Sequence, residues 1–100
     1  MTTTITEKNH SLVITFDGRL DTLSAPQAEK ALAPLANRRD TDIIIDCSRL
    51  EYISSGGLRV LLTAQRLARQ GGNSLCISRV NETVNNILTI TGFVHLFDFK

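Results

Sequence analysis

Two patterns of apolar residues alternate along this chain of 100 residues. In some segments every second residue is apolar, which is typical of a β-strand with one buried face. In others, apolar residues recur three and four positions apart, which is typical of an amphipathic α-helix. We therefore predict strands near residues 12–16, 43–47 and 75–78, and helices that begin near Ala25, Gly56 and Glu82.

Turn and capping signals mark the ends of these elements. A short strand at residues 3–6 is expected to pair with residues 12–16 through a turn near Asn9-His10. Asp17-Gly18 indicates a turn, although Arg19-Leu20 can continue the pairing after a bulge. Ser24 and Gln27 have the spacing of a capping box, which favours a helix start there. Pro34 predicts a kink or an early end of that helix.

Three consecutive isoleucines, Ile43 to Ile45, predict a strand that is buried on both faces, as in a parallel sheet. The helix that follows ends at Gly71-Gly72, and a further strand comes after it. Strand, helix and strand form a βαβ unit, so these two strands are expected to be parallel. Residues 93–99 are expected to form a short terminal strand or a packed tail.

Composition narrows the class of protein. The length and the absence of a linker predict one α/β domain spanning residues 1–100. A formal net charge of +1, with both signs interspersed, argues against direct nucleic-acid binding. No apolar run is long enough for a transmembrane segment, and no signal peptide is visible, so we expect a cytoplasmic protein. Cys47 and Cys76 are interpreted as small buried residues, and no cluster predicts a metal or a cofactor.

Ser54-Ser55-Gly56-Gly57 is the candidate functional motif, because it falls where a strand hands over to a helix. Serine is a favoured N-cap, glycine allows close backbone approach, and a helix N-terminus favours an anion such as a serine phosphate. A hydrolase would need a partner base and the Gly-x-Ser-x-Gly turn, which is absent. A nucleotide site would need a Gly-x-Gly-x-x-Gly or P-loop pattern, which is also absent. Simple helix capping and a phosphorylation switch both remain open from this pattern.

Three segments together resemble the STAS family, which includes domains of sulfate transporters and anti-sigma factor antagonists. Residues 52–62 are similar to the central signature of that family, and Gly18-Arg19-Leu20-Asp21 is similar to its Gly-x-Leu-Asp turn. Thr91-Gly92-Phe93 resembles its closing segment. The resemblance covers nearly the whole chain and implies a mixed, mostly parallel β-sheet with helices packed on it. It also implies a protein that is not an enzyme.

The resemblance to the antagonists further implies an anti-anti-sigma factor that regulates transcription by partner switching. An anti-sigma factor serine kinase would phosphorylate Ser55, and a protein phosphatase would reverse the modification. Ser54 stands where the best-known antagonists have Asp. It would belong to the partner-binding surface together with Asp21, Gly56 and Gly57. The alternatives are a STAS subunit of a membrane lipid transport complex and, from another class, a small nucleotide-binding module.

Overall fold

Six strands form one mostly parallel sheet in the computed structural model, which describes residues 1–100. The strands are β1 (Thr2–Lys8), β2 (Ser11–Leu20), β3 (Asp42–Asp46), β4 (Leu50–Ile53), β5 (Ser74–Ser78) and β6 (Asp98–Phe99). Their order is β1-β2-β3-β5-β6, and β4 pairs with β2. Only the pair of β1 and β2 is antiparallel, which confirms the predicted fold class.

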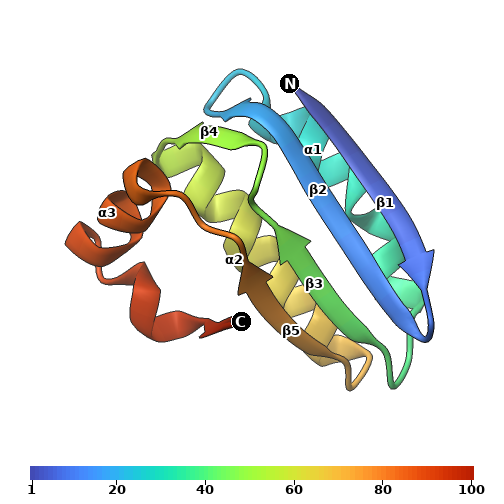
Figure 1. The fold of residues 1–100 in the computed structure, drawn as a ribbon. Helices are drawn as coiled ribbons and strands as arrows, with labels where there is room; N and C mark the ends of the chain where they lie inside the picture. Colours follow the sequence, from blue (N-terminus) through green and yellow to red (C-terminus); the bar gives the residue numbers. More distant parts are fainter.

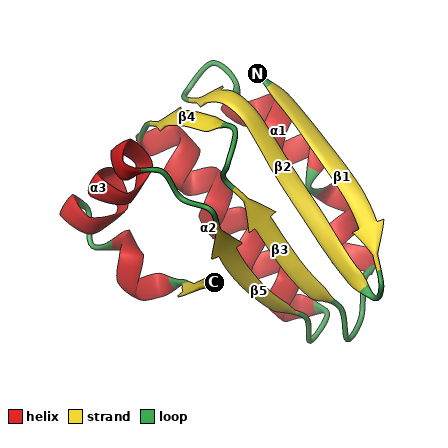
Figure 2. Cartoon of the chain, in the orientation of Figure 1, coloured by secondary structure: helices red, strands yellow, loops and turns green.

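The helices cover one face of this sheet. They are α1 (Ala25–Ala31), α2 (Ser55–Gln70) and α3 (Glu82–Ile90), with two 3-10 helices, η1 (Ala33–Asn37) and η2 (Phe93–Leu96). Figure 1 shows α1 and α2 behind β1, β2, β3 and β5, and α3 beside β4. The same view, coloured by secondary structure in Figure 2, shows no helix over the front face of these strands. No helix has both the length and the apolar character needed to span a membrane.

Strand β2 changes its parallel partner part way along its length. It pairs with β3 from Ser11 to Thr15, and with β4 from Gly18 onward. The register shifts between Gly18 and Arg19, so the predicted bulge is confirmed there. The hairpin turn at Asn9 and His10 is also confirmed, because both residues have positive φ values of 43° and 69°. The end of β2 thus lies beside β4, directly before α2.

The apolar core lies between the sheet and the helices and contains 21 buried residues. Ile43 and Ile45 are fully buried, but Ile44 is only half-buried, so the predicted burial on both faces is wrong. Side chains alternate between the two faces of a strand, and only one face here carries helices. Leu62 of α2, an apolar residue next to the buried Leu61, is also partly exposed.

The helix starts were predicted within one residue, but one capping interaction is different. The predicted capping box at Ser24 is wrong, since its side chain makes no cap bond to α1. Its hydroxyl instead accepts a bond from the Asp21 N–H and donates one to the Arg19 carbonyl. The early end at Pro34 is confirmed, because α1 ends at Ala31 and η1 replaces it.

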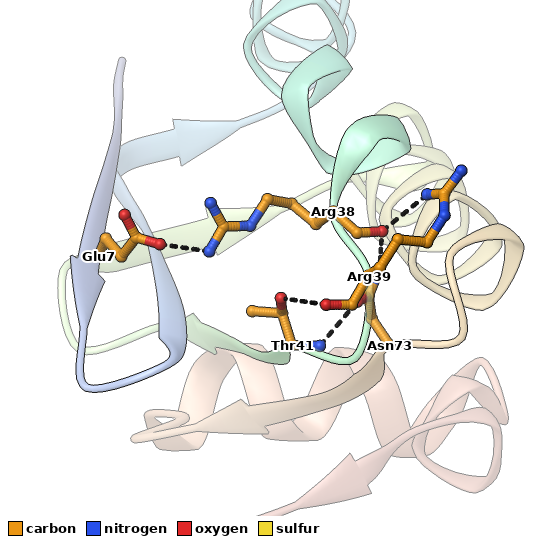
Figure 3. A network of polar contacts seen from close by, with 5 residues as sticks. All are labelled: Glu7, Arg38, Arg39, Thr41 and Asn73. Carbon is orange, nitrogen blue, oxygen red and sulfur yellow. Dashed lines mark hydrogen bonds and ion pairs between the residues drawn. The ribbon is translucent and has the colours of Figure 1, made fainter.

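A polar network fixes the C-terminal end of α2 (Figure 3). The Asn73 side chain accepts a bond from the Thr41 N–H at 2.8 Å and donates one to the Arg38 carbonyl at 3.0 Å. Arg38 also forms an ion pair with Glu7 of β1. Thr41 and Asn73 are the two buried polar residues of the chain. This network joins β1, the segment before β3 and the turn before β5.

Candidate functional site

Ser55 is the first residue of α2, and its side chain is exposed. It lies in a shallow depression of ≈ 270 Å³. The walls are Ser55, Gly56 and Arg59 from α2, and Thr22, Ala25, Pro26 and Glu29 from the α1 side. The depression therefore contains one carboxylate, one guanidinium and no histidine.

Gly56 and Gly57 allow the start of α2 to approach the end of β2. A Cβ atom on Gly57 would lie 2.3 Å from the Leu20 carbonyl oxygen, and one on Gly56 would lie 3.0 Å from Thr22 Cα. The Ser54 N–H donates a hydrogen bond to the same Leu20 carbonyl at 3.0 Å. The two glycines thus have a steric role, and Gly57 is itself buried.

Ser54 occupies the N-cap of α2 with extended backbone dihedrals, but its hydroxyl does not cap the helix. The Oγ atom is buried and has no hydrogen-bond partner. Of the two interpretations that the sequence left open, simple capping by the Ser54 hydroxyl is not observed. At the N-cap of α3, by contrast, Asn81 accepts a bond from the Val84 N–H at 2.8 Å.

Asp21 organises the loop between β2 and α1. One of its carboxylate oxygens accepts bonds from the N–H groups of Leu23 and Ser24, both at 3.1 Å. The bond from the Ser24 N–H is the main reason that the pKa of the Asp21 carboxyl lies below its ordinary value. The loop is therefore held in one shape, with the Leu23 side chain 92% exposed.

The structure places Ser55 and Gly56 in one depression and Asp21 in another. Gly56 lines the depression with Ser55, whereas Asp21 lines a neighbouring depression with Arg19, Leu23 and Ser24. Consecutive residues of one loop line the two hollows, since Thr22 lines the first and Asp21 the second. Thr22, Glu29 and Arg59 also line the depression around Ser55 but were not predicted from the sequence. For Arg59 a signal existed, since it follows Ser55 by one helical turn.

Arginine side chains surround this end of the molecule. Arg19 lies over the Tyr52 ring at 4.4 Å from its centroid, and Arg49 pairs with Asp17 at 3.6 Å. Arg59 is exposed and makes no ion pair. No group of three or more His, Cys, Asp or Glu side chains is arranged to hold a metal ion.

Comparisons with known proteins give the family of this chain. The STAS domain model matches residues 2–100. The BtrV protein of Bordetella bronchiseptica is 31% identical over 86 residues, which cover 86% of this chain and 74% of BtrV. The anti-sigma-B factor antagonist of Bacillus subtilis is 26% identical over 96 residues, which cover 96% of this chain and 87% of that protein.

The fold is also found among solved structures. An anti-sigma factor antagonist from Mycobacterium paratuberculosis superposes with a TM-score of 0.78 at 25% sequence identity. The match covers 98% of this chain and 83% of the other. With the mostly parallel sheet, the glycine-dependent start of α2 and the match over residues 2–100, the chain belongs to the STAS domain family.

Proposed function

We propose that this chain is an anti-sigma factor antagonist, a single STAS domain that binds an anti-sigma factor serine kinase and is switched off by phosphorylation of Ser55. Similarity to named antagonists over nearly the whole chain supports the function class, which is regulatory binding and not catalysis. The observation that carries the switch is the exposed Ser55 side chain at the first residue of α2. A kinase can reach this hydroxyl without unfolding the domain.

The same position explains why phosphorylation would leave the domain folded. A phosphoserine carries roughly −1.5 to −2 charges at neutral pH. The free N–H groups and the dipole at the start of a helix favour such a charge. The Ser55 hydroxyl makes no hydrogen bond within the domain, so its modification breaks none.

A docked partner would respond differently. A kinase that covers Ser55 would have to desolvate the phosphate or place it near a carboxylate. Asp21, Ser54 and Gly56 would belong to the covered surface, while the buried Gly57 would position it. We expect at least a tenfold loss of affinity, or about 1.4 kcal/mol. A phosphatase would restore binding, and these partners imply a role in the cytoplasm.

The test uses the purified protein, ATP and the anti-sigma factor kinase encoded in the same genome. Mass spectrometry should find one phosphate, on Ser55. Titration calorimetry should show that the kinase binds the modified protein at least about tenfold more weakly than the unmodified protein. Ser54→Ala should still be phosphorylated. Ser55→Ala should bind the kinase and accept no phosphate.

Two results would contradict this proposal. Phosphate on Ser54 alone would show that the switch residue is misassigned. Equal kinase affinity for the modified and unmodified proteins would show that phosphorylation does not control binding.

A further inference from the structure

We propose that Arg59 binds the phosphate group of phosphorylated Ser55 within the same helix, as an internal counterion. This inference rests on the proposed modification of Ser55. It assigns a role to a residue outside the motif that first indicated the site. Arg59 is a positioning residue here, because it acts on the orientation and the protonation of the phosphate.

The spacing of the two residues favours this contact. Ser55 and Arg59 are both in α2 and are four residues apart, so their side chains share one face of the helix. Both also line the depression of ≈ 270 Å³ between α1 and α2. A guanidinium group can donate two parallel hydrogen bonds to phosphate oxygens, which is the geometry that binds phosphate well.

Arg59 is also free to make this contact. The two ion pairs of the structure involve Arg38 and Arg49, so the Arg59 side chain loses no ion pair when it turns to a phosphate. In contrast, Arg38 is already paired with Glu7, and Arg49 with Asp17.

The other charges in the same depression would direct the phosphate toward Arg59. Glu29 of α1 lines this depression and would repel a phosphate. In the neighbouring depression, the negative charge of Asp21 is offset by the positive charge of Arg19. Arg59 is the single cationic side chain in the walls around Ser55. A nearby cation favours the dianion of a phosphoserine, and a nearby carboxylate opposes it. Arg59 would therefore keep the phosphate doubly charged at neutral pH.

The test uses full-length protein with phosphoserine incorporated at position 55 during translation, so that no kinase is needed. Phosphorus NMR during a pH titration gives the second pKa of the phosphate, which is about 6 in an unperturbed phosphoserine. In Arg59→Gln this pKa should rise by about 0.4, the effect expected of an exposed charge pair one helical turn apart. In Glu29→Gln it should fall by a similar amount.

Arg66→Gln is the matched control, because Arg66 is an exposed arginine of α2 that does not line the depression. It should leave the pKa unchanged. The effect of Arg59→Gln should also shrink in 1 M salt, where the screening length is about 3 Å. Thermal unfolding of each variant shows that the fold is retained.

Equal pKa values in the parent and Arg59→Gln proteins would overturn the inference. So would an equal rise in Arg66→Gln, which would indicate a general charge effect. If the pKa responds to Arg59 but the kinase does not modify Ser55, the counterion role stands and the proposed function fails. If the kinase modifies Ser55 but the phosphate pKa does not change in Arg59→Gln, the proposed function stands and the counterion role fails.

Discussion

At the N-cap residues of α2 and α3, two polar side chains occupy equivalent positions and make different interactions. Asn81 accepts a bond from the Val84 N–H and also donates one to the Leu50 carbonyl of β4. The buried Ser54 hydroxyl makes no bond at all. A buried polar group without a partner destabilises the folded state, whereas a cap bond stabilises it. The two residues should therefore contribute to stability with opposite signs.

This difference predicts the effects of alanine at each N-cap. Asn81→Ala should lower the free energy of unfolding by about 1–2 kcal/mol, because it removes the cap of α3 and leaves the Leu50 carbonyl without its donor. Ser54→Ala should raise it, by up to about 1 kcal/mol, because it removes a buried hydroxyl that has no partner and breaks no bond. Urea denaturation of both variants checks this. A cost for Ser54→Ala as large as that of Asn81→Ala would show that Ser54 does cap α2.

At the scale of elements, the turn between α2 and β5 depends on one side chain. The Asn73 amide joins the Thr41 backbone to the Arg38 carbonyl (Figure 3), so that β3 and β5 begin at matching positions. Asp42 pairs with Ser74 at the start of their parallel register. Gly71 packs so closely here that a Cβ atom would lie 2.1 Å from the Arg38 carbonyl oxygen.

Replacing this asparagine should therefore destabilise the domain. Asn73→Ala should lower the free energy of unfolding by about 2–3 kcal/mol, because it removes two hydrogen bonds and leaves the Thr41 N–H unpaired in a buried place. Asn37→Ala is the matched control, since Asn37 is exposed in η1. Its effect should stay within about 0.5 kcal/mol. Equal midpoints in urea for the two variants would contradict the structural role of Asn73.

The elements that the sequence predicted well are those with a long repeated pattern. The alternation along β2 and the helical spacing along α2 each reflect packing against one core, so their positions could be read directly. Strand β4 has only four residues and no clear alternation, and it was missed. The partial exposure of Ile44 could not be predicted, because three consecutive isoleucines do not indicate whether helices cover one face of the sheet or both.

The candidate site divides in the same way. Ser55, Gly56 and Gly57 were found from local chemistry, because a serine and glycines at a helix start have local physical reasons. Glu29 lies on another helix, and its position near Arg59 depends on how α1 packs against α2. The missing bond of Ser54 also depends on tertiary packing, since the N-cap position alone favours a cap.

At the scale of the whole molecule, the two thiols differ in their exposure to solvent. Cys47 is buried in the core, and burial, with the neighbouring Asp46 carboxylate, raises its pKa to about 12. Cys76 is half-buried, and its pKa is also raised, mainly by burial. The thiolate is the reactive form, so reaction at Cys47 requires the core to open.

Thiol labelling should therefore report the opening of the core. At pH 8 in the folded protein, Cys76 should react with a disulfide reagent at least about tenfold faster than Cys47. In the Cys76→Ser variant, labelling of Cys47 should accelerate in step with unfolding as urea is added. Similar labelling rates of the two thiols without denaturant would contradict the buried position of Cys47.

The close contact of Gly56 and Gly57 with the end of β2 has a further consequence. The walls around Ser55 come from two stretches of chain that meet only when the start of α2 packs against the end of β2 and the loop that leads into α1. A short peptide carrying Ser54-Ser55-Gly56-Gly57 would present one wall and lack the other. An enzyme that recognises both walls reads a conformational epitope, so it would mark only chains that have completed folding. The proposed phosphorylation would then be restricted to folded chains, in addition to weakening their binding to the partner.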